Sequence, residues 1–192
     1  MQKGNYLMTI LKSPKTVFTL EDIAMLWQLP NTNSTMVRLS YYAKNGDLMR
    51  VRRGVYVKNK QYNKTELATR IYAPSYVSFE TVLAQNGLIF QFQSKIQIAS
   101  YLGREVEIDG QIYLYKKIKD AILANSIGVN NVNETSVATC ERAFLDTLYI
   151  NDDYHFDNLR SINWNKVFDI LPIYNNLRMT KIVNQLFEQS KI

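Results

Sequence analysis

The residues from Thr16 to Val57 constrain the fold of this chain most, because they follow the pattern of two short helices and a basic β-hairpin. Thr19 is followed by Glu21 and Asp22, and a hydroxyl N-cap with acidic residues in the first turn is typical of a helix start. Pro30 and the polar Asn-Thr-Asn run after it predict the end of this first helix and a turn. The apolar positions that recur at helical spacing and predict its buried face are Leu20, Ile23, Ala24 and Trp27.

A second helix is expected from Asn33 to about Asn45, before Gly46. The residues predicted to face inward are Met36, Leu39, Ser40 and Ala43, with Tyr42 at the edge. On the opposite side, at i, i+4, i+7 and i+11, lie Ser34, Arg38, Tyr41 and Asn45. Side chains of these types can reach base edges and phosphates in a DNA major groove. A simple solvated helix face would have the same composition, and this alternative stays open for the helix taken alone.

The hairpin that follows strengthens the DNA-binding interpretation. Two β-rich runs, 48–51 and 55–57, flank Arg52, Arg53 and Gly54. Strand alternation predicts that Arg50 and Arg52 share one face, with Arg53 at the tip. Two helices followed by a basic hairpin predict a winged helix-turn-helix, with the second helix in the major groove and the hairpin along the backbone. The residues expected at the DNA are Ser34, Thr35, Arg38, Tyr41, Lys44, Asn45, Arg50, Arg52 and Arg53.

The charge of the chain is concentrated in this same part of the sequence. Residues 1–60 contain ten Lys and Arg against three Asp and Glu, whereas the remainder contains 13 basic and 14 acidic residues. This asymmetry favours a polyanionic partner. No apolar run approaches the ~20 residues that span a bilayer. The N-terminus lacks the pattern of a secretory signal, and the single cysteine suits a reducing compartment, so we expect a cytoplasmic protein without a membrane segment.

The complete sequence predicts an α+β protein with two domains. We expect the winged helix-turn-helix in residues 1–60 and a mixed α/β domain with a helical tail in residues 61–192. In the second domain, Asp109-Gly110 between two β-rich runs is the strongest hairpin signal. The other expected strands are 96–100 and 129–137, and the expected helices are 65–72, 79–86, 120–124, 139–150, 164–171 and 177–189.

Three motifs resemble the AbiEi-type antitoxins, bacterial proteins of type IV toxin–antitoxin systems with relatives in abortive infection. They are R-R-G-V-Y-V at 52–57, Y-V-S-F-E-T-V-L-A-Q-N-G-L-I at 76–89 and T-C-E-R-A-F-L-D-T-L-Y at 139–149, in the family's order and spacing. The resemblance covers about residues 5–150, and Cys140 stands where relatives often have proline.

The resemblance implies a transcriptional autorepressor that binds repeats in its own promoter through the winged domain. The second domain is then expected to counteract a co-encoded nucleotidyltransferase toxin, often without a stable complex. The family's DNA contacts, carried over to this chain, fall on Arg38, Arg50, Arg52 and Arg53. An alternative is a winged-helix regulator whose C-terminal domain binds a ligand or another protein.

The signals for an enzyme are weak, and we expect no catalytic residue, cofactor or metal. His155 is the only histidine and lies in a polar segment that predicts a solvated loop. Cys140 is expected at the first position of a helix, but no second Cys or His lies beside it in sequence. Glu105 and Glu107 form a paired-carboxylate pattern, yet alternation in a hairpin predicts that both face solvent. An enzyme that uses the second domain is the third hypothesis.

Overall fold

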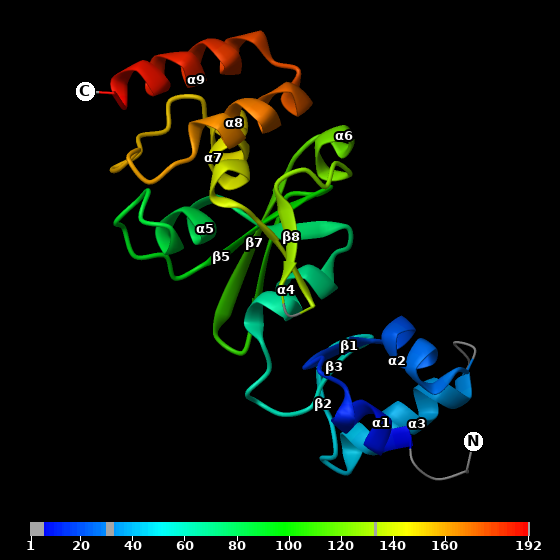
Figure 1. The fold of residues 1–192 in the computed structure, drawn as a ribbon. Helices are drawn as coiled ribbons and strands as arrows, with labels where there is room; N and C mark the ends of the chain where they lie inside the picture. The colour runs from blue at the N-terminus through cyan, green and yellow to red at the C-terminus, as the bar shows by residue number, and fades with distance from the viewer. Residues whose placement is uncertain (1–5, 30–32, 133, 192) are drawn as a thin grey trace. The chain divides into compact units, whose positions relative to one another are not determined.

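The computed structural model describes residues 6–29, 33–132 and 134–191 and has the predicted α+β class (Figure 1). The chain divides into two compact units, Met1–Ile71 and Tyr72–Ile192. The expected division after residue 60 precedes helix α4 (Lys64–Ile71), which packs on strand β1 (Val17–Thr19) within the first unit. Among the described residues, no helix has the length and apolar character needed to cross a bilayer.

The first unit combines helices with a small antiparallel sheet. Its elements before α4 are α1 (Tyr6–Lys12), β1, α2 (Leu20–Trp27), α3 (Asn33–Lys44), β2 (Met49–Arg52) and β3 (Val55–Val57). The strand order is β1-β3-β2, so the expected hairpin gains a third strand that the sequence did not predict. The buried core contains Ile10, Phe18, Ile23, Trp27, Leu39, Leu48 and Tyr56.

The predicted start of α2 is confirmed. The Thr19 Oγ1 atom accepts a hydrogen bond from the Asp22 backbone N–H at 3.1 Å, and Asp22 Oδ2 accepts one from the Thr19 N–H at 2.9 Å. This reciprocal capping box satisfies two backbone donors that a helix start otherwise leaves unpaired. Ile23, Ala24 and Trp27 are buried as expected. The expected stop at Pro30, Asn31 and Thr32 lies outside the described residues.

Helix α4 is attached to the strand that opens the sheet. The Glu66 side chain is buried, and its Oε2 atom accepts hydrogen bonds from the Thr16 backbone N–H at 3.0 Å and the Thr16 hydroxyl at 2.6 Å. The Asn63 backbone N–H donates to the Thr16 hydroxyl at 2.9 Å. Because Thr16 directly precedes β1, these bonds fix the segment that follows the hairpin to the start of the sheet.

The second unit contains a six-stranded mixed sheet with the order β6-β7-β5-β4-β9-β8. Its strands are β4 (Ser75–Val77), β5 (Ile96–Ser100), β6 (Arg104–Ile108), β7 (Gln111–Lys117), β8 (Val129–Val132) and β9 (Thr135–Ala138). The hairpin at Asp109-Gly110 is confirmed as β6–β7. Strand β4 was not predicted, and the single strand expected over 129–137 is instead the antiparallel pair β8–β9, in which residue 133 lies outside the described residues.

Helices cover this sheet in successive layers. They are α5 (Phe79–Gln85), α6 (Asp120–Leu123), α7 (Cys140–Ile150), α8 (Trp164–Ile170), the 3-10 turn η1 (Leu171–Tyr174) and α9 (Leu177–Gln189). Figure 1 shows α8 and α9 stacked beyond α7 on the side away from the strands. The predicted inward residues of α7, Ala143, Phe144, Leu145 and Leu148, are all buried. Helix α7 is therefore central to the core of the second unit.

Candidate nucleic-acid interface

Helix α3 faces the core of the first unit with a different set of residues from the one expected. Thr35 and Leu39 are buried, and Tyr42 and Ala43 pack against the same core. Met36 is 41% exposed and Ser40 is also exposed, so the prediction that both face inward was wrong. Thr35, expected at the DNA, is only 2% exposed and belongs to the buried face.

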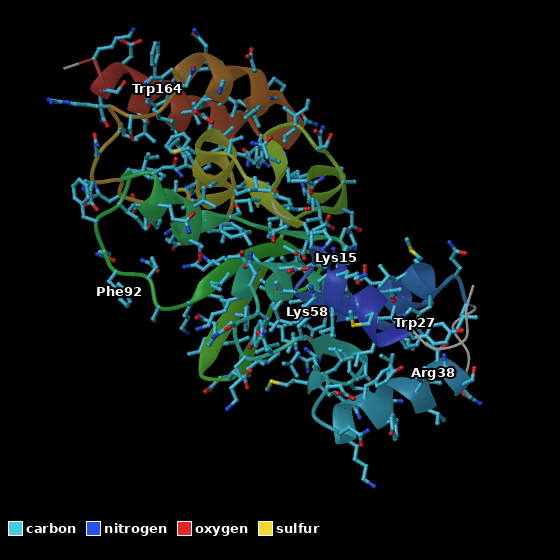
Figure 2. All side chains as sticks on the ribbon, turned by 60° about the horizontal axis from the view of Figure 1, so that its bottom comes forward. Lys15, Trp27, Arg38, Lys58, Phe92 and Trp164 are labelled. Atoms are coloured by element: carbon cyan, nitrogen blue, oxygen red, sulfur yellow. The ribbon has the colours of Figure 1, made fainter. Side chains whose placement is uncertain are left out.

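Arg38 lies across aromatic rings instead of extending from the surface. Its guanidinium carbon is 4.0 Å from the centre of the Tyr6 ring and 5.9 Å from that of Trp27. The Trp27 indole N–H donates to the Tyr6 backbone oxygen at 2.9 Å. Figure 2 labels Arg38 and Trp27 on neighbouring parts of the first unit. Arg38 therefore connects α3 to α1 and α2, and cation–π attraction stabilises this arrangement.

Changing Arg38 to alanine is expected to lower the free energy of unfolding of the first unit by about 1–2 kcal/mol, because cation–π contacts and stem packing are lost. DNA affinity should fall equally for preferred and non-preferred duplexes. The measurements are urea unfolding and fluorescence anisotropy with two duplexes. Arg38→Met, which retains an apolar stem, is the control that should lose less stability. A change in base preference with unchanged stability would instead make Arg38 a base-reading residue.

The solvent-facing side of α3 has Val37 at its centre and mostly polar residues around it, with Met36, 41% exposed, at one edge. Val37 is 68% exposed and Tyr41 is 60% exposed. The other exposed residues on this side are Asn33, Ser34, Ser40 and Lys44, and Asn45 is exposed just beyond the helix end. The helix contains no acidic residue. Of the α3 residues expected at the DNA, Ser34, Tyr41 and Lys44 remain on this face, whereas sequence reasoning missed Val37 and assigned Ser40 to the core.

Arg50 and Arg52 were expected to share one face of the hairpin, but the structure separates them. Arg50 pairs with Tyr56 and Arg52 pairs with Val55, because the register shifts between the two arginines. Paired residues lie on the same face of a sheet and consecutive residues of β3 on opposite faces, so this bulge separates Arg50 from Arg52. Arg50 and Arg53 are exposed, while Arg52 is half-buried. Gly54, with φ +79°, forms the tip beside Arg53, a conformation that favours glycine.

The first unit contains the excess positive charge. Residues 1–71 include 12 Lys and Arg against four Asp and Glu, a net charge of +8, whereas residues 72–192 include 11 against 13, a net charge of −2. Some cations have structural partners: Lys15 pairs with Asp22 at 2.8 Å, and the Lys58 ammonium donates to the Leu11 carbonyl at 3.1 Å. Among the described residues of this unit, the exposed cations are Lys12, Lys44, Arg50, Arg53, Lys60 and Lys64.

An open hollow of about 360 Å³ lies next to β2. It is lined by Gly46, Met49, Lys58, Asn59, Lys60 and Gln61. Burial lowers the pKa of the Lys58 amine, and the charge of Glu66 partly opposes that shift. The hollow is thus a basic, amide-rich surface between the end of α3 and the segment after the hairpin.

The second unit contains a buried network around the Asp146 carboxylate. Asp146 accepts hydrogen bonds from Ser78 Oγ at 2.7 Å, Tyr174 OH at 2.6 Å and Tyr76 OH at 3.0 Å. Arg142 Nε donates to the same carboxylate at 3.3 Å, and neither side chain is exposed to solvent. Burial raises the pKa of Asp146, whereas the guanidinium and the three hydroxyl donors lower it. The carboxylate therefore has donors on both oxygens.

Arg142 Nη2 also donates to the Tyr76 hydroxyl at 2.8 Å, and the guanidinium binds three backbone carbonyls. Nη2 donates to Ile122 O at 2.7 Å, and Nη1 donates to Ile127 O at 2.7 Å and to Asn125 O at 3.3 Å. These carbonyls belong to the segment between β7 and β8. Gly128, in the same segment, has no space for a larger side chain, since an added Cβ would lie 2.9 Å from Arg142 Cβ and from Ile170 Cδ1. The network therefore fixes this connection onto α7 and has a structural role.

The candidate residues for enzymatic chemistry lie on strand β6, in an exposed loop and at the start of α7. Glu105 and Glu107 are both exposed, which confirms their predicted position, and Glu105 pairs with Lys95 at 2.7 Å. His155 is exposed in a loop. Within the described ranges, no group of three or more His, Cys, Asp or Glu side chains is arranged to hold a metal ion.

Cys140 is expected to resist alkylation in the folded chain. Burial, with a smaller effect from the charge of Glu141, raises the pKa of its thiol to about 12 from an ordinary value of 9.0. Because only the thiolate reacts, the raised pKa should make the reaction with iodoacetamide near neutral pH slower than in the unfolded chain by a factor on the order of a hundred to a thousand. The measurement is mass spectrometry over time, with and without urea. Comparable rates in both states would contradict this assignment.

No protein-family model matches the chain, and no curated protein sequence matches it. The two units themselves therefore provide the evidence for a function. The first unit of this α+β chain carries a helix with a mostly polar exposed face and a basic hairpin, and the second unit is built around a buried polar network.

Proposed function

We propose that this chain is a non-enzymatic, DNA-binding antitoxin and autorepressor, with a winged helix-turn-helix as its first unit. The element order supports the proposal: a helix, a short strand, two helices and a β-hairpin follow one another, and the short strand β1 completes the sheet with the hairpin. A winged helix-turn-helix has this order, and the second of its two paired helices reads the DNA bases.

The distribution of charge is the observation that carries the DNA-binding proposal. Exposed side chains of α3 and the hairpin combine Lys44, Arg50 and Arg53 with hydroxyl groups, and the first unit has a net charge of +8. A major groove about 12 Å wide admits one α-helix. In the proposed complex, α3 enters that groove and the hairpin arginines bind phosphates on the flanking backbone.

The antitoxin part of the proposal depends on the resemblance to AbiEi-type proteins. Two of the motifs that carry the resemblance, at 76–89 and 139–149, meet in the second unit, because Tyr76 and Ser78 both donate to Asp146. The two motifs therefore contact each other within one folded unit. We propose that this unit counteracts a co-encoded nucleotidyltransferase toxin without a stable complex.

Binding of the full chain to a duplex from immediately upstream of its own gene tests the DNA-binding proposal. We expect tighter binding, by fluorescence anisotropy, than to a scrambled duplex of equal length and composition. A reporter driven by the same upstream DNA should be repressed by the chain. Equal affinity for the two duplexes together with an unrepressed reporter would overturn the autorepressor function.

A regulator whose second unit binds another protein is the alternative, and an exposed aromatic loop favours it. Phe90 is 73% exposed and Phe92 is 92% exposed, and Figure 2 shows Phe92 on the loop between α5 and β5. Hydrogen bonds hold this loop: the Phe90 N–H donates to Asp157 Oδ2 and the Gln111 amide donates to Ser94 O, both at 2.8 Å. Exposed aromatic residues on a held loop are typical of protein contact sites.

Co-expression with the product of the adjacent gene separates the two functions. An antitoxin should restore growth when that product is toxic, with no complex recovered by affinity purification. A regulator that docks a protein through its second unit should give a recovered complex that the double variant Phe90→Ala with Phe92→Ala loses. Growth that stays inhibited in the presence of the full chain would overturn the antitoxin proposal.

A further inference from the structure

Val37 occupies the centre of the exposed face of α3. Its neighbours one turn away on that face are Ser34, Ser40 and Tyr41, and Lys44 lies two turns away. Val37 is 68% exposed, more than any other apolar side chain of the helix. The face therefore has an apolar centre whose named neighbours one and two turns away form hydrogen bonds, with the partly exposed Met36 at its edge.

The side chain of Val37 has properties suited to a fixed apolar contact. A β-branched residue in a helix is restricted to one strongly preferred rotamer, so its two methyl groups have a defined direction before any partner binds. Arg38, the next residue, is held on the Tyr6 ring and does not cover Val37's side of the helix. A face that meets DNA with Val37 at its centre thus presents methyl groups to the base edges.

The most prominent apolar group that unmodified bases display in the major groove is the 5-methyl group of thymine. Every other major-groove edge offers hydrogen-bond donors or acceptors, which a valine leaves unsatisfied. Placing Val37 over a thymine methyl removes apolar surface of both partners from water, which is favourable. Placing it over an amino group or a carbonyl oxygen removes that group's hydrogen bonds to water without replacing them.

We infer that Val37 is a specificity-determining residue that reads the methyl group of a thymine in the bound duplex. This inference rests on the proposed DNA-binding function and adds the base class that the centre of α3 recognises. The serine hydroxyls and Tyr41 on either side then contact neighbouring base edges or phosphates, and Lys44 contributes affinity that does not depend on the base.

Replacing thymine with deoxyuridine tests the inference, because this change removes the methyl group and keeps every hydrogen-bonding group of the base pair. The full chain first selects its preferred duplexes from a pool with a randomised core. The best duplex is then synthesised with deoxyuridine at each thymine in turn. For each bound α3 helix, deoxyuridine at one particular thymine should weaken binding of the unchanged protein about fourfold. This factor corresponds to the free energy of burying one methyl group.

Two variants make the test specific to Val37. Val37→Ala should bind the thymine and deoxyuridine duplexes with nearly the same affinity, because the contact is already lost. Lys44→Ala is the matched control from the same face: it should bind both duplexes more weakly and keep the fourfold ratio between them. Since both side chains are exposed, circular dichroism and the thermal midpoint should be unchanged for both variants.

The possible results separate this inference from the proposed function. A chain that selects no duplex from the pool overturns both. Selective binding that no deoxyuridine substitution weakens, or that Val37→Ala leaves equally sensitive to the substitution, overturns only the role of Val37. A fourfold ratio that is present in the unchanged protein and in Lys44→Ala, and absent in Val37→Ala, supports it.

Discussion

Asp146→Ala is expected to destabilise the second unit by about 3–5 kcal/mol, since it leaves the Arg142 guanidinium buried without its charged partner. The hydroxyls of Tyr76, Ser78 and Tyr174 also lose their common acceptor. A loss of this size is a large part of the total stability of a domain. The variant should therefore unfold at a much lower urea concentration.

The two tryptophans allow this loss to be measured for one unit at a time. Trp27 belongs to the first unit and Trp164 to the second. With fluorine-labelled tryptophan, fluorine NMR in urea should show the Trp164 signal shifting to a lower midpoint while that of Trp27 keeps its own. Asp153→Ala, which removes an exposed carboxylate, is the matched control and should change stability by less than about 0.5 kcal/mol.

A double variant distinguishes the ion pair from the other bonds of the network. Arg142→Met combined with Asp146→Leu removes both charges and should recover part of the loss. Recovery should remain incomplete because three backbone carbonyls, of Ile122, Asn125 and Ile127, lose their donor. An Asp146→Ala variant as stable as the Asp153→Ala control would contradict the structural role of the network.

Affinity for promoter DNA is expected to fall roughly 250- to 1,000-fold when monovalent salt rises fourfold. In the proposed complex, the exposed cations of the first unit replace counterions condensed on the duplex, and four to six phosphate contacts would give a log–log slope of about −4 to −5. Fluorescence anisotropy across a salt series measures this slope. A flat response would remove the electrostatic basis of the DNA-binding proposal.

Arg50→Ala combined with Arg53→Ala should make that slope shallower by about 2, because each lost phosphate contact contributes about 0.9. Affinity should fall for all duplexes alike, since phosphate contacts carry no sequence information. Arg160→Ala, which removes an exposed arginine of the second unit, is the control and should leave the slope unchanged. An unchanged slope in the double variant would mean that the hairpin does not contact the DNA backbone.

The features predicted correctly from the sequence are those that short stretches of chain determine. The cap at Thr19, the turn at Asp109-Gly110 and the apolar face of α7 each depend on residue types at fixed local spacing. Strands β1 and β4 have three residues each, too few for an alternating pattern, whereas the equally short β3 was predicted from the Arg-Arg-Gly turn beside it. These two strands form because they pair with strands that are distant in the sequence, and no local pattern of residues indicates that pairing.

The candidate site was predicted less well because its details depend on contacts between elements. In the sequence, Arg38 has the position of a surface residue. Only the fold places it against the aromatic rings of Tyr6 and Trp27, which come from two other helices. The bulge that separates Arg50 from Arg52 has no signature in the sequence of β2. Arg142 and Asp146, four residues apart in α7, would suit a solvated helix face equally well, and only the tertiary fold buries them.

The two sides of α3 perform different tasks, and this division bears on how such a protein can change over time. Thr35, Leu39 and Arg38 hold the helix in its unit, while Val37 and Ser40 on the outer side leave the core unaffected when they are replaced. Substitutions on the outer side can therefore accumulate at little cost in folding. Under the proposed DNA-binding function, a lineage with this architecture would acquire new operator sequences through a few surface positions of one helix while its interior stays constant.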